Sequence, residues 1–153
     1  MNDVAETLAG MVEAAFQRLK SIDAQTAARR PGPGQWSKKE IVGHLIDSAA
    51  NNHQRFIRAQ QQSDLPFAPY DQERWVELNA YQEAAWEELL LLWKYYNVQL
   101  AHIIRRIPPE RQAHTCRIGS NPPVTLKFLA EDYVAHMRLH FKQLGLLGTP
   151  LTY

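Results

Sequence analysis

The fold is decided by residues 36–48, which read WSKKEIVGHLIDS. Ser37 and Glu40 stand three residues apart, the spacing at which each side chain accepts a hydrogen bond from the other residue's backbone N–H at the start of a helix. Apolar residues follow at helical spacing as far as Phe56. We therefore expect a long helix over residues 38–60.

A second helical pattern precedes this stretch. Asp3 and Glu6 have the same capping spacing, and apolar residues recur after them every three or four positions. These signals predict a helix over residues 3–20. Two prolines and two glycines lie within residues 29–34 and break any helix there, because proline lacks a backbone donor and glycine leaves the backbone too free. We expect a loop in this segment.

A third long helix is predicted beyond an extended, proline-containing connection near residue 66. The helical pattern after this connection is nearly continuous, but Asn79 and Gln82 have the spacing of a new helix start. We therefore divide it into a short helix over 72–78 and a long helix that residues 108–109, both proline, bring to an end.

The last predicted helix begins after Thr125 and ends near Gly145, which stands where a left-handed C-terminal cap is expected. We interpret residues 110–124, which contain one glycine and two prolines, as a surface loop. No segment shows the periodicity of a strand. The sequence thus predicts an all-α protein. We expect a four-helix bundle with a short extra helix before the third long one, in a single domain over residues 1–153.

The amino-acid composition favours a globular domain and disfavours nucleic-acid and membrane partners. The 153 residues are 45% hydrophobic and 22% charged, as is typical of globular domains. Seventeen basic and sixteen acidic residues leave a formal charge of +1, which disfavours a nucleic-acid partner. The single cysteine, Cys116, excludes an internal disulfide. Since neither a signal peptide nor a long apolar segment is recognisable, we expect a cytoplasmic protein with no membrane partner.

Three of the six histidines, His44, His136 and His140, lie on faces that the helical pattern turns wholly or partly inward. His136 and His140 are four residues apart, so their rings project from one side of a helix and can chelate one cation. A third histidine from a facing helix would leave one coordination position open. Met137 stands where the zinc-protease motif requires glutamate, which disfavours that class. On spacing alone, histidines satisfied by hydrogen bonds are the alternative.

Residues 36–48, continuing to Asn52 and Arg55, resemble the second helix of the DinB-like superfamily. Residues 133–140, YVAHMRLH, resemble its last helix, and the resemblance covers most of the chain in order and length. It implies a bundle in which one histidine of the second helix and two of the last helix bind a divalent metal, commonly zinc or nickel. In this sequence the implied ligands are His44, His136 and His140.

The resemblance also implies candidate activities. The superfamily includes transferases that use bacillithiol, mycothiol or glutathione, proteins described as metal-dependent hydrolases, and many members without a known activity. We expect first a metal-dependent S-transferase that activates a low-molecular-weight thiol for attack on a small-molecule electrophile. The second hypothesis is a hydrolase that uses metal-bound hydroxide. The third is a non-catalytic binding or scaffold protein that the metal stabilises. Bundles with aromatic-rich helices often pair, so we include a second copy of the chain, as a homodimer, among the expected partners.

Polar residues accompany the histidine of the predicted second helix. His44, Asp47, Ser48, Asn51 and Arg55 form a strip along one side of it. We interpret this strip as the solvated face. The alternative is that it lines a pocket beside the metal, where Asp47 orients a ring or a water molecule and moves protons, which makes Asp47 the catalytic candidate.

Two further residues have weaker signals. Asp132, four residues before His136, has the spacing to hydrogen-bond the second ring nitrogen of that histidine, although capping or simple exposure explains it equally well. Cys116 has only His114 as a potential activating neighbour in the sequence, so we do not expect it to be a nucleophile.

Overall fold

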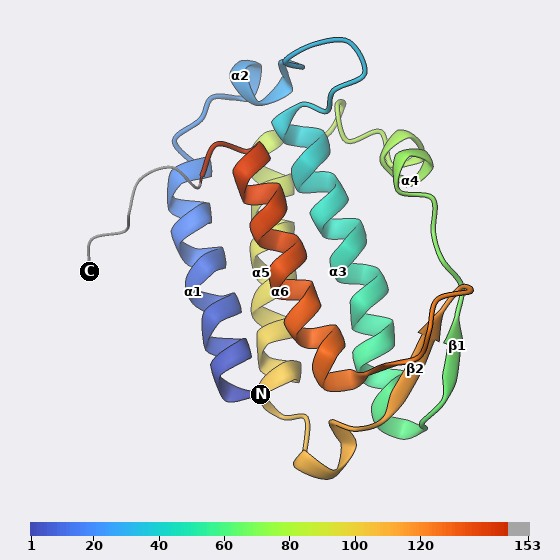
Figure 1. Ribbon diagram of the computed structural model, residues 1–153. Coiled ribbons are helices and arrows are strands. Elements are labelled where there is room, and N and C mark those ends of the chain that lie inside the picture. The colour runs from blue at the N-terminus through green and yellow to red at the C-terminus, as the bar shows by residue number, and fades with distance from the viewer. Residues whose placement is uncertain (147–153) are drawn as a thin grey trace.

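In the computed structural model, which describes residues 1–146, four long helices lie side by side (Figure 1). They are α1 (Asn2–Leu19), α3 (Lys38–Gln61), α5 (Trp86–Arg105) and α6 (Leu126–Gln143). α1 packs on α5, α5 on α3, α3 on α6 and α6 on α1, so the four apolar faces enclose one core. The predicted all-α four-helix bundle is confirmed; the last residues of the predicted domain, 147–153, lie outside the described part.

The long helices do not simply alternate in direction. α3 and α5 run the same way along the bundle, while α1 and α6 run the opposite way (Figure 1). The chain must therefore return along the bundle between α3 and α5, and residues 62–85 form this crossing segment. It contains strand β1 (Leu65–Phe67) and helix α4 (Gln72–Leu78). α4 is the predicted short helix, with the predicted bounds, and it packs on α3.

Side-chain caps fix the ends of the two helices that matter for function. The Ser37 hydroxyl accepts from the backbone N–H of Glu40 at 3.2 Å, and the Glu40 carboxylate accepts from the backbone N–H of Ser37 at 2.8 Å. Thr125 caps α6 by accepting from the N–H of Phe128 at 3.1 Å. Gly145, with φ +74°, takes the left-handed conformation predicted beyond the end of α6. These signals come from the local sequence and are confirmed.

Two predicted helix caps are wrong. α1 begins one residue before Asp3 and has no side-chain cap, so Asp3 lies in its first turn, where a carboxylate interacts favourably with the helix dipole. α5 begins at Trp86 rather than after Asn79, which instead ends α4. Gln82 uses its side chain elsewhere, accepting from the Ser37 hydroxyl at 2.8 Å and donating to the carbonyl of Ala28 at 3.1 Å.

A small sheet corrects the expectation that the chain has no strands. β1 pairs in parallel with β2 (Thr115–Ile118), and β2 pairs antiparallel with β3 (Val124–Thr125). Residues 110–124 are thus more than a surface loop, since β2 follows a 3-10 helix at Pro109–Arg111. Strands of two to four residues are too short for their periodicity to be recognised. Helix α2 (Ala24–Ala28), capped by Asp23, was also not predicted.

The core supports the helix that carries the histidine pair. Trp93 of α5, Phe56 of α3 and Met137 of α6 are fully enclosed. Asn97 is fully buried as well, and it accepts from the hydroxyl of Tyr133 at 2.6 Å while donating to the Trp93 carbonyl at 2.8 Å. Because a buried amide is costly unless it is hydrogen-bonded, this pairing fixes α6 in rotation relative to α5.

Candidate metal centre

Three imidazole rings meet between α3 and α6. His44 extends from α3 and is fully buried, while His136 and His140 extend from successive turns of α6 and are half-buried. The Nε2 atoms of His44 and His136 lie 3.4 Å apart, and those of His136 and His140 lie 3.0 Å apart. One nitrogen of each ring lies within 4.8 Å of both others. The packing of α3 on α6 thus brings together the three histidines predicted as ligands.

Hydrogen bonds alone do not satisfy this arrangement. The Nε2 of a neutral imidazole carries either one proton or one lone pair, so His136 can satisfy only one of its two neighbours. A cation shared by the three nitrogens would satisfy them all. Metal–nitrogen bonds of about 2.0–2.1 Å place neighbouring ligand atoms roughly 2.8–3.4 Å apart for bond angles between about 90° and the tetrahedral value, and both measured separations fall within these limits. The donor set suits a divalent transition metal.

The electrostatics of the site keep the rings neutral. Burial, together with the neighbouring His140 and His136, lowers the pKa of His44 to about 3. Burial, followed by the effect of His140, lowers the pKa of His136 to about 4. Burial also lowers the pKa of His140, although its hydrogen bond with Gln143 acts in the opposite direction. Neutral rings have the lone pairs that a metal ligand must supply.

Neighbouring side chains orient two of the rings. The Nδ1 atom of His140 lies 2.8 Å from the Oε1 atom of Gln143, an acceptor that places the ring proton on Nδ1 and leaves Nε2 free. The Trp36 ring packs on His44 with 5.2 Å between ring centroids. The Nδ1 atom of His44 is buried and has no hydrogen-bond partner within residues 1–146. Packing therefore orients His44, and a hydrogen bond orients His140.

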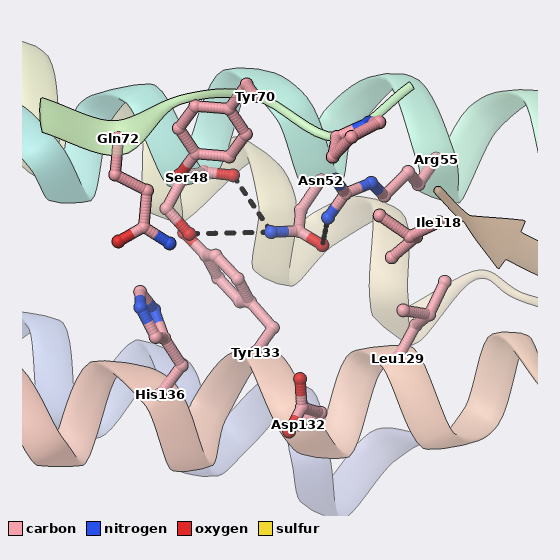
Figure 2. A pocket seen from close by; sticks show the side chains of 11 residues that line it. Ser48, Asn52, Arg55, Tyr70, Gln72, Ile118, Leu129, Asp132, Tyr133 and His136 are labelled. Carbon is pink, nitrogen blue, oxygen red and sulfur yellow. Dashed lines mark hydrogen bonds between the residues drawn. The ribbon is translucent and has the colours of Figure 1, made fainter. Parts of the chain in front are cut away.

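A pocket of about 260 Å³ opens beside His136 (Figure 2). On its wall α3 contributes Ser48, Asn52 and Arg55, and the crossing segment contributes Tyr70 and Gln72. Ser48, Asn52 and Arg55 are each more than nine-tenths buried. The interpretation of the polar strip as a solvated face is therefore wrong, because the crossing segment and β2 cover it. Two members of the strip, Ser48 and Arg55, line this pocket, so the alternative interpretation holds for these two residues.

Asp47, the predicted catalytic residue, lies on the same strip with a 3% exposed side chain. Its Oδ1 atom accepts from the Tyr81 hydroxyl at 2.6 Å and from the Asn79 amide at 3.1 Å. Its Oδ2 atom is buried without a partner among the described residues. Burial raises its pKa to about 6, although the Tyr81 hydrogen bond opposes this rise. The hydrogen bonds of the Asp47 carboxylate thus lead to the crossing segment rather than to a histidine.

Among residues 1–146, neither of the two residues with weaker signals hydrogen-bonds to the histidine cluster. Asp132 is exposed and lines the pocket from α6, but within residues 1–146 it makes no hydrogen bond to His136. Cys116 is 1% exposed, and burial raises the pKa of its thiol. The thiol is therefore poorly suited to act as a nucleophile.

Several residues around the site were missed by the sequence analysis. Tyr70 and Gln72 belong to the crossing segment, which carries no motif, and their position depends on how this segment folds over α3. Gln143 follows His140 by three residues, and this helical spacing was the one available signal for its contact with the ring. Arg55 was assigned to the polar strip, but its burial could not be predicted from the helix alone.

Comparison with known proteins agrees with this fold. The family model described as the DinB superfamily matches residues 7–144. The chain belongs to the DinB superfamily. The matched range contains the three histidines, and the resemblance noted for residues 36–48 is confirmed. In this DinB chain no helix within the described residues is long and apolar enough to cross a bilayer.

Curated relatives of this DinB chain include proteins named "Putative metal-dependent hydrolase" from Bacillus mycoides (strain KBAB4) and Bacillus cereus (strain B4264). Each is 30% identical over 60 residues, an alignment that covers 39% of this chain and 35% of the relative. The chain thus spans about a third of the length of the curated relatives that it matches.

Solved structures share the bundle. YfiT from Bacillus subtilis, described as "a probable metal-dependent hydrolase with an unusual four-helix bundle topology", superposes with a TM-score of 0.74 and 18% identity over 94% of this chain and 86% of YfiT. A mycothiol-dependent maleylpyruvate isomerase superposes with a TM-score of 0.76 and 14% identity over 97% of this chain and 62% of the isomerase. At these identities the likeness shows the fold alone.

Proposed function

We propose that this DinB-superfamily protein is an enzyme that binds a divalent metal, zinc or nickel, through His44, His136 and His140. The observation that carries the proposal is the convergence of three neutral imidazole nitrogens at the edge of a polar pocket. The cluster has three members within residues 1–146. Three protein ligands leave a coordination position for a reactant, whereas structural zinc sites have four.

The metal, when bound, would lower the pKa of a thiol or a water molecule so that a thiolate or hydroxide forms near neutral pH. The chain's own residues would hold and orient the reactants. Gln143 would keep the His140 ring in its binding tautomer, and the pocket beside His136 would receive a small-molecule substrate. Asp47 remains the proposed proton carrier, since a carboxyl group with a pKa of about 6 exchanges protons readily near neutral pH.

The reaction that we favour is thiol transfer. The sulfur of bacillithiol, mycothiol or glutathione would bond to an electrophilic carbon, the leaving group would depart with its electron pair, and the thiol proton would pass to solvent or to Asp47. The mycothiol-dependent isomerase of the same fold supports the use of a low-molecular-weight thiol. Hydrolysis is the second candidate, and the names of the curated relatives and of YfiT support it.

Metal content tests the first part of the proposal. The protein is purified without a chelator and without a nickel column, and its zinc and nickel are measured by elemental analysis. We expect about one metal per chain, lost in His136→Ala and His140→Ala and retained in His102→Ala, a variant of an exposed histidine on α5. A His136→Ala/His140→Ala double variant that keeps its full metal content would refute the proposed site.

Turnover then separates the candidate functions. The metal-loaded protein is assayed with 1-chloro-2,4-dinitrobenzene and each of the three thiols, and with 4-nitrophenyl acetate in the absence of thiol. Thioether formation that requires both metal and thiol would support transfer, whereas ester cleavage without thiol would support hydrolysis. If the metal-loaded protein shows a fourth protein ligand and no turnover, this would instead support the hypothesis of a non-catalytic scaffold protein. Dimerisation and a cytoplasmic location remain predictions.

A further inference from the structure

The pocket beside His136 holds a buried positive charge. Arg55 is 8% exposed, and within the described residues its one hydrogen bond to another side chain joins Nη1 to Oδ1 of Asn52 at 3.4 Å. No carboxylate lies within 4.0 Å of the Arg55 guanidinium in the described part of the chain. A guanidinium has five N–H donors, so most of the donors of Arg55 have no protein partner among residues 1–146. A buried charge without a counterion is costly, and such groups are normally paired.

Among residues 1–146, the titratable groups that interact with Arg55 carry no negative charge near pH 7. Tyr70 and Cys116 are the titratable groups that interact with Arg55, and both are neutral near pH 7, because burial raises the pKa of Tyr70 to about 12 and also raises the pKa of the Cys116 thiol. Asp132 lines the same pocket but extends from α6, across from α3 (Figure 2). The Arg55 end of the pocket therefore favours an anion from outside the chain.

Arg55 and the candidate metal centre lie at two ends of one pocket. Figure 2 shows His136 and Arg55 toward opposite ends, with the guanidinium pointing along α3 toward Asn52. Neutral polar groups of Ser48 and Gln72 lie near the histidine end (Figure 2). A small molecule with an anionic group at one end and its reacting atom at the other would span this arrangement.

We propose that Arg55 binds the carboxylate of a small organic acid, and that the substrate of this protein is such an acid held with its reacting end toward His136. This inference rests on the proposed function for its reacting end, but the anion site itself depends only on Arg55 and the pocket. The planar guanidinium matches a carboxylate through two parallel N–H···O bonds, and the buried setting strengthens both. Asn52 holds the guanidinium in place for this contact.

Binding of succinate, with succinamide as its neutral analogue, tests the proposal. Calorimetry is carried out on the metal-loaded protein and again after metal removal with a chelator. We expect succinate to bind both forms and succinamide to bind neither. Arg55→Met should weaken succinate binding at least about tenfold. Arg55→Lys should retain part of it, because an ammonium keeps the charge but not the bidentate geometry. Arg105→Met, a variant of an exposed arginine on α5, should bind like the wild type.

Other outcomes would overturn the proposal. Equal binding of succinamide and succinate would show that charge is not recognised, and tighter binding of inorganic phosphate than of succinate would exclude a carboxylate site. Succinate binding that survives in Arg55→Met but disappears in His136→Ala would place the acid on the metal instead. Metal content is measured in each variant, so a failure of the metal site remains distinguishable from a failure of the anion site. If Arg55→Met does not fold, the binding of succinamide and of inorganic phosphate to the wild type, each compared with that of succinate, still tests whether the pocket recognises a carboxylate.

Discussion

The aromatic ring of Tyr81 lies directly against the Cα atom of Gly43, in the space that the side chain of any other residue at this position would occupy. Tyr81 belongs to the crossing segment, and from this position its hydroxyl donates to Asp47, one turn along α3 from Gly43, at 2.6 Å. The missing side chain of Gly43 thus lets the crossing segment approach α3 closely. This contact holds one edge of the segment that forms the pocket.

A methyl group at position 43 should displace this ring. We expect Gly43→Ala to lower the free energy of unfolding by about 1–3 kcal/mol, because overpacking of a well-packed site outweighs the gain in helix propensity. Displacement of Tyr81 should also release the Asp47 carboxylate from its hydrogen bond. Urea denaturation measures the first effect.

Gly10→Ala is the matched control, since Gly10 lies within α1 and a Cβ atom there would meet no atom of residues 1–146 within 4 Å. This variant should gain about 0.5–1 kcal/mol from the better helix propensity of alanine. A Gly43→Ala protein as stable as Gly10→Ala would contradict the close packing of Tyr81.

The contact between Gln143 and His140 should tune metal affinity. Replacing Gln143 with leucine removes the acceptor for the Nδ1 proton of His140, so the ring loses its fixed tautomer and orientation. Because Gln143 is exposed and water can partly replace it, we expect zinc affinity to fall by about tenfold, the lower end of the range for such contacts. Competition with a chromophoric zinc chelator measures the change.

Two control variants accompany the measurement of zinc affinity. Gln143→Glu keeps an acceptor and should bind zinc at least as tightly as the wild type. Lys142→Leu places leucine at the neighbouring exposed position and removes a positive charge, so it should not weaken zinc binding. Identical affinities in Gln143→Leu and Lys142→Leu would mean that this glutamine does not orient the ring.

The four long helices could be predicted because their signals are local. The capping box at Ser37 and the cap at Thr125 each act within three residues, and the apolar period of each helix reports one buried face. The start of α5 could not be predicted in this way. Gln82 has partners 45 and 54 residues away, at Ser37 and Ala28, and these tertiary contacts outweigh its local capping spacing. The sheet was missed because its strands are too short to show alternation.

In the candidate site too, features set by local spacing could be predicted, and features that depend on tertiary packing could not. The spacing of His136 and His140 predicted their common direction, since residues four apart share one face of a helix. The prediction that His44 joins them rested on the resemblance, because neither the sequence of α3 nor that of α6 alone predicts that these two helices pack together. The burial of Arg55 and the hydrogen bond from Tyr81 to Asp47 both depend on the crossing segment, whose path no local pattern specifies.

Cys116 should be unreactive in the folded protein. Its thiol is 1% exposed on β2, and burial raises its pKa, so little thiolate is present and the reagent has no access. We expect 5,5′-dithiobis(2-nitrobenzoic acid) to label the native protein at least about tenfold more slowly than the protein in urea. Cys116→Ala should retain the metal content of the wild type. Rapid, complete labelling of the native protein would contradict the buried position of this residue.

Asp47 should make the stability of the protein depend on pH. Burial raises its pKa from 3.8 in the unfolded chain to about 6 in the folded protein, so the folded state holds the proton more tightly. The stability associated with this group is complete below the unfolded pKa and is lost as pH rises through the folded pKa. An asparagine at this position is neutral throughout, so Asp47→Asn should not lose this stability.

The expected result is a stability difference between Asp47→Asn and the wild type that grows in favour of the variant by about 2 kcal/mol from pH 4.5 to pH 7.5. Urea denaturation at both pH values, on protein freed of metal by a chelator, measures it. The histidines titrate in both proteins, so their contribution cancels in the difference. Glu83→Gln, which removes an exposed carboxylate from the crossing segment, controls for the loss of one negative charge. A difference between Asp47→Asn and the wild type that stays constant over this range would show that the carboxyl of Asp47 is not held in its protonated form by burial.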